Sequence, residues 1–164
     1  MRILGIDPGL RRSGWGIVES SGTSLKYVAC GVITPKANIP ISQRLAALYH
    51  EMITVIEEYS PEEAAIEETF VNRNPASALK LGQARGVLLM IPALKSIPIE
   101  EYGANKIKKS VVGSGHATKQ QIGMMVKTLL PACGAFGEDE ADALAVAITH
   151  AHYRSLSTVI AGVE

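Results

Sequence analysis

The stretch Arg2-Ile3-Leu4-Gly5-Ile6-Asp7-Pro8-Gly9 opens the chain and decides how the rest of the sequence is interpreted. Its first five residues are mostly apolar, which predicts a short strand in the interior of a sheet. Pro8 and Gly9 then favour a turn. Asp7 stands at the end of the strand, where a carboxylate is costly unless it caps the turn, is paired or holds a cation. The stretch therefore indicates a turn cap or one part of a metal or phosphate site.

The composition is that of a globular protein. The chain has 164 residues, of which 47% are hydrophobic, and a chain of this length buries a substantial core as one domain. No apolar run approaches the roughly 20 residues that span a bilayer, and the first residues lack the plan of a secretory signal. Cys30 and Cys133 form no CxxC motif and are typical of reduced thiols. We therefore expect a cytoplasmic protein without a membrane segment.

The formal net charge of zero hides an uneven distribution of charge. Residues 73–127 hold nine Lys and Arg but only two acids, Glu100 and Glu101, so this segment carries +7 and the remainder carries −7. A basic half predicts a surface for a polyanion such as nucleic acid. A set of solvated helix faces explains the same charges equally well.

The order of the expected elements indicates a single α/β domain with a mixed five-stranded sheet flanked by helices. Three strands with short turns between them come first, which predicts an antiparallel meander. A helix, a strand, a second helix and a fifth strand follow, and three helices end the pattern. The expected strands cover residues 2–7, 14–19, 25–33, 64–66 and 97–102. The expected helices cover residues 41–59, 76–94, 104–112, 118–130 and 138–154.

Four acids stand where the core pattern would not place them. Asp7 and Glu67 each follow an expected strand, and Asp139 and Asp142 lie three residues apart at the start of the last expected helix. That spacing puts both aspartates on one face of the helix. Each acid also has an ordinary explanation, as a turn cap, a solvated strand end or a complement to the helix dipole. Together they favour one shared site, because four converging carboxylates need cations to neutralise them.

The predicted site offers only oxygen ligands. Such ligands suit Mg²⁺ or Mn²⁺, and no cluster of His and Cys competes for zinc. Two such ions can activate a water molecule and stabilise the leaving oxygen in phosphodiester hydrolysis. We therefore expect two Mg²⁺ ions per active site as the cofactor, with Mn²⁺ as a substitute.

Several blocks of the sequence resemble one family of nucleases. The blocks are Gly5-Ile6-Asp7-Pro8-Gly9 with Gly14-Trp15-Gly16, Ala65-Ile66-Glu67-Glu68-Thr69-Phe70, Ala78-Leu79-Lys80-Leu81-Gly82-Gln83-Ala84-Arg85-Gly86 and Asp139-Glu140-Ala141-Asp142-Ala143-Leu144-Ala145. They resemble the RuvC-type Holliday-junction resolvases, and the resemblance runs from Met1 to about His152. It implies an RNase H-like nuclease domain over residues 1–154, with residues 155–164 as a C-terminal tail.

The resemblance also implies a function and partners. It implies a structure-selective endonuclease that resolves four-way DNA junctions in recombination and repair. The enzyme would be a homodimer making paired, symmetric, Mg²⁺-dependent nicks with 5′-phosphate ends. A branch-migration motor complex is a further implied partner.

The resemblance also implies roles for individual residues by their positions in the chain. The residues that match the catalytic metal ligands are Asp7, Glu67, Asp139 and Asp142. Lys108 and Lys119 match basic residues near the scissile strand, and Lys119 is expected to stabilise phosphate charge or assist the attacking water. Phe70 matches an aromatic residue beside the active site. An exposed Phe70 can stack on an unpaired base, whereas a buried one would be an ordinary core residue.

Two arginines are further candidates for contacts with DNA. Arg73 lies in residues 71–74, where the chain departs from the family's pattern. Arg85 lies in a helix with many small residues, and it fits a packing role equally well. Those small residues allow close approach of a neighbour, which is either the sheet or a second copy of the chain.

Two other functions remain open at this point. An Asp-Pro-Gly turn after a first strand also resembles the phosphate loop of actin-like sugar kinases, although those proteins need two such domains. A non-catalytic junction-binding module is the other alternative. Loss of one of the four acids would favour that module, and none is missing.

Overall fold

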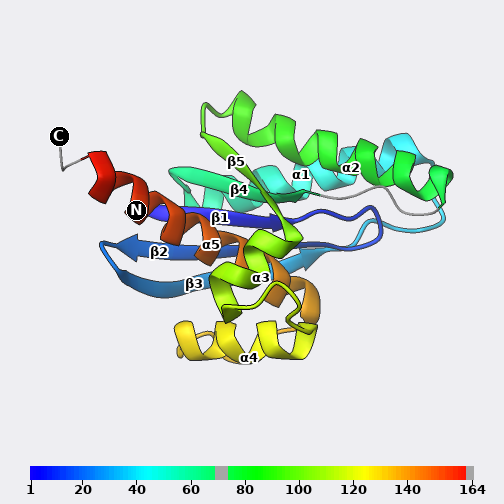
Figure 1. The fold of residues 1–164 in the computed structure, drawn as a ribbon. Coiled ribbons are helices and arrows are strands. Elements are labelled where there is room, and N and C mark those ends of the chain that lie inside the picture. Colours follow the sequence, from blue (N-terminus) through cyan, green and yellow to red (C-terminus); the bar gives the residue numbers. More distant parts are fainter. Residues whose placement is uncertain (69–73, 162–164) are drawn as a thin grey trace.

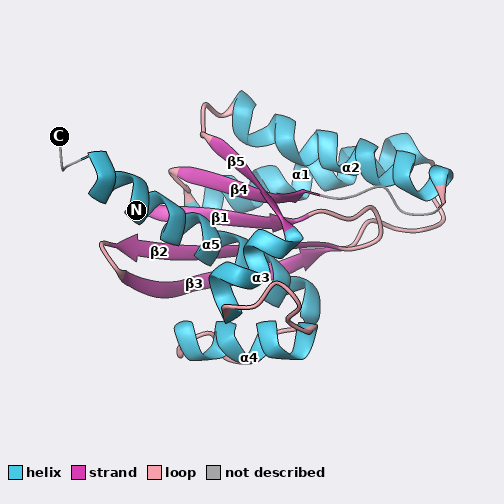
Figure 2. Cartoon of the chain, in the orientation of Figure 1, coloured by secondary structure: helices cyan, strands magenta, loops and turns pink. Residues whose placement is uncertain are grey.

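The computed structural model describes residues 1–68 and 74–161, with side chains up to residue 154 in the last helix. A five-stranded sheet lies between two layers of helices (Figures 1 and 2). The strands are β1 (Arg2–Asp7), β2 (Ser13–Ser21), β3 (Ser24–Ile33), β4 (Glu63–Glu68) and β5 (Ile99–Gly103). The helices are α1 (Ile41–Tyr59), α2 (Pro75–Leu94), α3 (Ala104–Val112), α4 (Lys119–Leu129) and α5 (Glu138–Ala161).

The sheet is mixed, as the sequence predicts. Its strand order is β3-β2-β1-β4-β5. Strands β1, β2 and β3 pair antiparallel, whereas β1 with β4 and β4 with β5 pair parallel. Ile6 of β1 lies opposite Ile66 of β4. The next residue of each strand is an acid, so Asp7 and Glu67 end neighbouring parallel strands at the same edge of the sheet.

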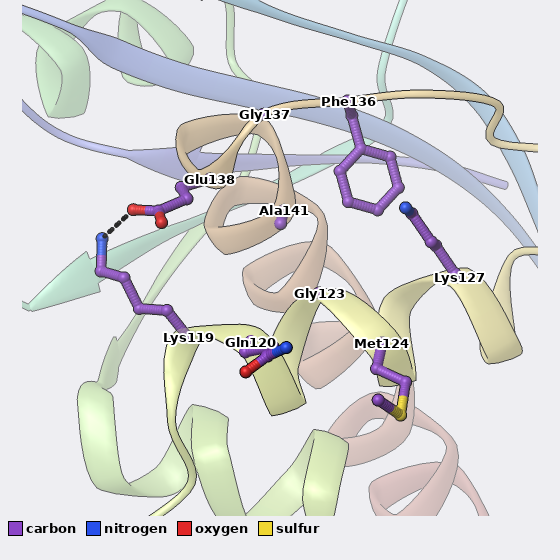
Figure 3. A pocket seen from close by; sticks show the side chains of 9 residues that line it. All are labelled: Lys119, Gln120, Gly123, Met124, Lys127, Phe136, Gly137, Glu138 and Ala141. Atoms are coloured by element: carbon purple, nitrogen blue, oxygen red, sulfur yellow. Dashed lines mark ion pairs between the residues drawn. The ribbon is translucent and has the colours of Figure 1, made fainter.

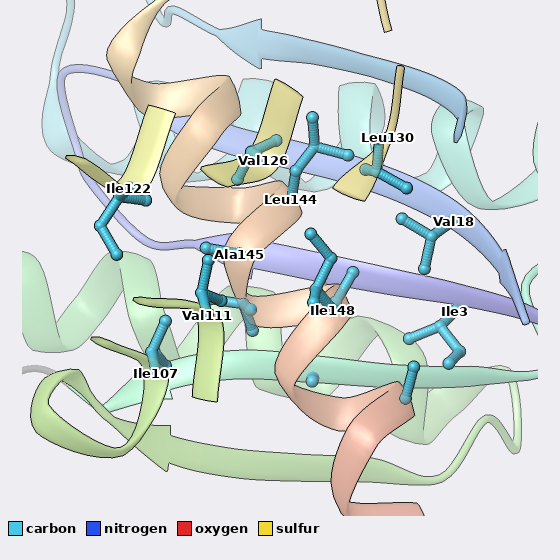
Figure 4. Packing of buried hydrophobic residues seen from close by; sticks show 14 of the residues in the cluster. Ile3, Val18, Ile107, Val111, Ile122, Val126, Leu130, Leu144, Ala145 and Ile148 are labelled. Atoms are coloured by element: carbon cyan, nitrogen blue, oxygen red, sulfur yellow. The ribbon is translucent and has the colours of Figure 1, made fainter. Parts of the chain in front are cut away.

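Side chains of a strand alternate between the two faces of the sheet, and each face has its own core. Helices α1 and α2 cover one face, where Leu4, Ile17 and Ile66 are fully buried. Helix α5 crosses the other face, with α3 and α4 beside it, and packs on Ile3 and Val18 (Figure 4). Ile3 and Ala65 point towards the α5 face. Asp7 lies four residues after Ile3 in β1 and Glu67 two residues after Ala65 in β4, so both acids point towards the same face.

Helix α5 lies unusually close to the sheet because the strands beneath it carry glycines. A Cβ added to Gly5 would lie 2.1 Å from the carbonyl oxygen of Ala143, and one added to Gly14 would lie 2.0 Å from that of Asp139. Real Cβ atoms do not approach so closely. The buried run 143–148 of α5 is therefore in direct contact with the strands, as its nearly all-apolar sequence predicts. The same contacts fix where α5 begins.

The structure departs from the expected elements mainly at the C-terminal end. Helix α5 continues to Ala161, whereas the sequence pattern predicts its end at Arg154 and a tail from residue 155. Residues 155–161 contain no Pro or Gly, and the first glycine, Gly162, comes directly after the helix. Within the described residues, no helix is long and apolar enough to cross a membrane.

Candidate active site

The four predicted acids come together at one edge of the sheet, beneath the start of α5. Asp7 is contributed by β1, Glu67 by β4, and Asp139 and Asp142 by the first two turns of α5. The pKa of Asp7 rises from its ordinary value of 3.8 to about 8, first because it is buried and then because of the charges of the other three acids. Electrostatic coupling of this kind requires the four carboxylates to be neighbours.

Glu67 and Asp142 are perturbed in the same direction. Burial raises the pKa of Glu67, and the charge of Asp142 raises it further. Burial also raises the pKa of Asp142, although its hydrogen bond with Lys119 opposes that effect. The cluster of Asp7, Glu67, Asp139 and Asp142, called the carboxylate cluster below, thus holds more negative charge than its surroundings neutralise.

Two cations are paired with the aspartates of α5. The Nε of Arg12 lies 2.5 Å from Oδ2 of Asp139, and Nζ of Lys119 lies 3.2 Å from Oδ2 of Asp142. Among the residues that the structure describes, no three His, Cys, Asp or Glu side chains gather closely enough to hold a metal ion. The four acids are therefore neighbours, but Asp139 and Asp142 are paired with cationic side chains.

The carboxylate cluster nevertheless fits a hard divalent cation. Its donors are all carboxylate oxygens, the ligand type that Mg²⁺ and Mn²⁺ prefer. Burial first and then the charges of the other three acids raise the pKa of Asp7, and a bound cation would offset both effects. Small side-chain rotations of Asp139 and Asp142, away from Arg12 and Lys119, would free their oxygens for a metal.

The predicted lysines lie beside the cluster on the α3–α4 side. A pocket of about 180 Å³ is lined by Lys108 and Lys119 together with Glu67 and Asp142. Both lysines lower the pKa of Glu67, although less than burial raises it. The structure thus places two cationic side chains next to the acids.

Lys119 is held in place by the start of α4. Thr118 is the N-cap: its hydroxyl accepts a hydrogen bond from the N–H of Gln121 at 3.2 Å, and its own N–H donates to Oε1 of Gln121 at 2.8 Å. This is the capping box that the sequence predicts at this position. The cap therefore fixes the backbone at Lys119, the first residue of α4.

Removing this cap should be measurable as a loss of stability. We expect Thr118→Ala to lower the free energy of unfolding by about 1 kcal/mol, a typical cost for losing an N-cap. Thr128→Ala makes the same chemical change within α4, where the exposed hydroxyl donates only to the carbonyl of Met124, and should cost nothing measurable. Urea unfolding of both variants checks this. Equal losses would show that the cap contributes no specific stability.

A larger pocket opens on the other side of Lys119, between α4 and the start of α5. It has a volume of about 690 Å³. Figure 3 shows Lys119 paired with Glu138 at one end, at 3.6 Å, and Lys127 beside the ring of Phe136 at the other. The Nζ of Lys127 lies 5.3 Å from the centre of that ring. The pocket adjoins the carboxylate cluster and has a cationic side chain at each end.

Arg85 has internal partners in the structure. Its guanidinium forms an ion pair with Glu101 of β5, and its Nε donates to the backbone carbonyl of Glu67 at 3.4 Å. Arg85 thus lies behind the end of β4, on the α2 side of the sheet, and supports the strand that carries Glu67. A contact between Arg85 and DNA stays a prediction. Phe70 and Arg73 lie outside the described residues.

Neighbouring acids take little part in the cluster. Glu68 is exposed and has the opposite parity to Glu67 on β4, and Glu140 turns back towards Gly137. Glu138 reaches Lys119 and raises the pKa of Asp142 slightly, so it belongs to the rim of the site. The sequence leaves Glu138 open as a complement to the helix dipole or as a further ligand, since it lies one helical turn before Asp142.

Arg12 is a neighbour of the carboxylate cluster that the sequence did not suggest, through its ion pair with Asp139. It lies in the turn between β1 and β2, and the pairing of Asp7 with Gly14 returns the chain to the same sheet edge. Its partner Asp139 is 127 residues away in sequence, so only its closeness to Asp7 along the chain could have suggested it.

Comparisons with known proteins agree with this architecture. The family model described as "Crossover junction endodeoxyribonuclease RuvC" matches residues 3–150. A protein of that name from Paramagnetospirillum magneticum is 57% identical over 161 residues, covering 98% of this chain and 97% of the relative. Another of that name, from Methylocella silvestris, is 56% identical and covers 100% of this chain and 93% of the relative.

A solved structure is similar in fold as well as in sequence. It is the RuvC of T. thermophilus in complex with a Holliday junction substrate, with a TM-score of 0.89 and 31% identity. The match covers 96% of this chain and 97% of that one. The RNase H-like fold expected from the sequence is thereby confirmed. On these grounds, the chain belongs to the RuvC family of crossover junction endodeoxyribonucleases.

Proposed function

We propose that this protein is a crossover junction endodeoxyribonuclease that cuts four-way DNA junctions, with the carboxylate cluster as its catalytic site. The observation that carries the proposal is the convergence of four acids from β1, β4 and α5 in a member of this family. The T. thermophilus relative, which shares the fold over nearly the whole chain, was solved with a Holliday junction. A non-catalytic binding module would have no use for an unneutralised cluster of buried acids.

The proposed cofactor is Mg²⁺, with two ions in each active site and Mn²⁺ as a substitute. Asp7, Glu67, Asp139 and Asp142 would hold them, because they supply the oxygens and the excess negative charge. When bound, the ions supply Lewis-acid stabilisation of charge and lower the pKa of the attacking water. The family provides the further proposal that the bond from phosphorus to the 3′-oxygen breaks. The oxygen of water bonds to phosphorus as the 3′-oxygen departs, and the 3′-oxygen takes up a proton, leaving 5′-phosphate and 3′-hydroxyl ends.

The lysines of the site would act on the scissile phosphate. Lys119 pairs with Asp142 at 3.2 Å, and Lys108 lines the same pocket. Phosphate oxygens gain negative charge as the phosphodiester is attacked, and positioned cations stabilise that charge. In the complex, Lys119 would therefore turn from Asp142 to the phosphate, which leaves the carboxylate free for a metal.

We further propose that the protein acts as a homodimer, since a four-way junction offers two like strands to a two-fold symmetric pair of sites. Helix α2 supplies a suitable surface. Leu79 and Met90 are 67% and 46% exposed, and Gly82 and Gly86 between them face open space. Gly82 and Gly86 therefore do not pack on the sheet, whereas Ala84 between them is fully buried in the core beneath α2. The branch-migration motor complex is a proposed partner on family grounds alone.

The proposed function is tested by incubating a labelled four-way junction and a linear duplex of the same sequence with the protein. With Mg²⁺, we expect paired nicks at symmetric positions of the junction and little cutting of the duplex. Without a divalent metal, we expect binding but no nicks. Binding with no cleavage under any metal condition would favour the non-catalytic module, and equal cutting of both substrates would indicate a general nuclease.

A further inference from the structure

A basic groove lies on the side of the carboxylate cluster away from Lys108 and Lys119. It has a volume of about 400 Å³ and runs between the turn after β1, the start of α1 and the first half of α2. Its charged side chains are Arg11 and Arg12 from the turn, Arg44 from α1 and Lys80 from α2. Among the residues that the structure describes, no carboxylate lines it. We call these four residues with their pocket the α1–α2 groove.

The cations of the α1–α2 groove are largely unneutralised. Arg11 and Lys80 are exposed and form no ion pair within the described part of the chain. Arg44 donates from Nη2 to the carbonyl of Leu10 at 2.9 Å, which holds the turn against α1. The Nε of Arg44 is buried and, among the described residues, has no hydrogen-bond partner. Arg12 is paired with Asp139, whereas Arg11, Arg44 and Lys80 have no acidic partner among the described residues, and such neighbouring cations repel one another unless an anion is bound.

The groove is continuous with the carboxylate cluster. Arg12 lines the groove and also reaches Oδ2 of Asp139. Gly9, which lines the groove as well, is only two residues beyond Asp7. Lys108 and Lys119 flank the same acids from α3 and α4, on the opposite face of the sheet. The acids therefore lie between two basic surfaces.

We propose that the α1–α2 groove binds the phosphodiester backbone of the DNA where the duplex leaves the carboxylate cluster, an inference that rests on the proposed function. Arg and Lys side chains are the usual partners of phosphate oxygens, and such contacts position DNA without reading its sequence. The DNA would enter over Lys108 and Lys119, cross the sheet edge at the acids and continue along the groove. Arg12 joins the two regions, since release from Asp139 would let its guanidinium contact a phosphate.

The expected signature is a change in the salt dependence of junction binding. Each phosphate that a cation neutralises contributes about 0.9 to the slope of log K against log salt. Replacing two groove cations should therefore lower the magnitude of the slope by about 1.8. Arg11 and Lys80 are the residues to replace, because neither touches the acids or supports the backbone.

The test compares two double variants in junction binding without divalent metal, by fluorescence anisotropy across a series of salt concentrations. Arg11→Gln/Lys80→Gln removes two charges from the groove. Lys26→Gln/Lys95→Gln removes two charges from the opposite end of the sheet, where Lys26 pairs in register with Glu19 and Lys95 pairs with Glu57. For the groove variant, the slope of log K against log salt should be smaller in magnitude by about 1.8, and binding at 0.1 M salt should be at least several-fold weaker than for the wild type. The control should match the wild type.

Equal slopes for the groove variant, the control and the wild type would overturn the inference. Thermal unfolding of each protein, together with Arg11→Gln and Lys80→Gln singly, separates a failure to fold from a loss of contact. Each folded single variant should lose about half of the effect. Cleavage of the junction by the wild type with Mg²⁺ is measured in parallel. If the wild type cleaves but the slopes are equal, the groove inference alone fails, whereas a wild type that never cleaves contradicts the proposed function.

Discussion

Replacing Asp7 with asparagine should abolish junction cleavage and leave junction binding intact. Asparagine keeps the shape of the side chain but removes the charge that a metal ligand needs. Asp7 is the member of the carboxylate cluster whose pKa is raised by the charges of all three other acids. We expect the rate of Mg²⁺-dependent nicking to fall by at least about a thousandfold, the upper range for losing one preorganised charged group. Gel assays of cleavage and of binding measure the two effects separately.

The matched control is Glu68→Gln, which also neutralises an acid at this sheet edge. Glu68 is exposed and has the opposite parity to Glu67, so its loss should leave the nicking rate within about twofold of the wild type. An Asp7→Asn protein that still cuts at nearly the wild-type rate would contradict the assignment of the cluster as the catalytic site.

The same substitution should stabilise the metal-free protein at neutral pH. The pKa of Asp7 is raised from 3.8 to about 8 in the fold, so the folded state holds a proton that the unfolded chain releases. The unfolding free energy should therefore fall as pH rises from about 4 to about 8. The asparagine of Asp7→Asn does not ionise, so this variant does not lose stability in that way as the pH rises. At pH 8 we expect it to be more stable than the wild type by at least about 1 kcal/mol, or roughly 3 °C in Tm.

Thermal unfolding between pH 5 and pH 8, with and without Mg²⁺, checks this second consequence. Added Mg²⁺ should raise the Tm of the wild type, because a ligand that binds only the folded state stabilises it. It should raise the Tm of Asp7→Asn much less. Parallel Tm curves for both proteins at all pH values would mean that Asp7 is not an unneutralised buried acid.

Gly14→Ala should impair both stability and cleavage. A Cβ at this position would lie 2.0 Å from the carbonyl oxygen of Asp139 and 3.3 Å from its Cβ. The first turn of α5 must therefore move away from β2, at a cost of about 1–3 kcal/mol for overpacking. Asp139 and Asp142 move with that turn. A displacement of about 1 Å at a reacting centre typically costs about a hundredfold in rate, and we expect a loss of that size.

Gly123→Ala serves as the control for stability. Its added Cβ would meet nothing within 4 Å, and alanine is favoured over glycine inside a helix by up to about 1 kcal/mol. It should therefore be as stable as the wild type or more so. A Gly14→Ala protein with unchanged Tm and nicking rate would show that contact with β2 does not fix the position of α5.

The sequence predicts that the four acids come together, because each is marked by a local signal. Asp7 and Glu67 follow short apolar strands, and the spacing of Asp139 and Asp142 fits one face of a helix that is otherwise apolar. These signals lie within a few residues of each acid. The predicted sheet is likewise confirmed, since its strands and turns carry strong local patterns.

The features that the sequence does not reveal depend on contacts between distant segments. The pairing of Arg12 with Asp139 joins residues 127 positions apart, and charge alone does not choose a partner over that distance. The close contact of α5 with Gly5 and Gly14 depends on how a helix docks, which no local pattern encodes. From the sequence, the small residues of α2 could face either the sheet or a second copy of the chain. Only the packed structure shows that Gly82 and Gly86 face open space.

The proposal that the carboxylate cluster holds the metal ions needed to cleave DNA can be tested directly by calorimetry. Mg²⁺ is titrated into the protein bound to a junction that is made uncleavable by phosphorothioate at the scissile positions. For the wild type, we predict about two ions bound per protomer. We predict markedly weaker binding for Asp7→Asn, Glu67→Gln, Asp139→Asn and Asp142→Asn, and no change for Glu68→Gln. Undiminished Mg²⁺ binding in the four cluster variants would contradict the claim.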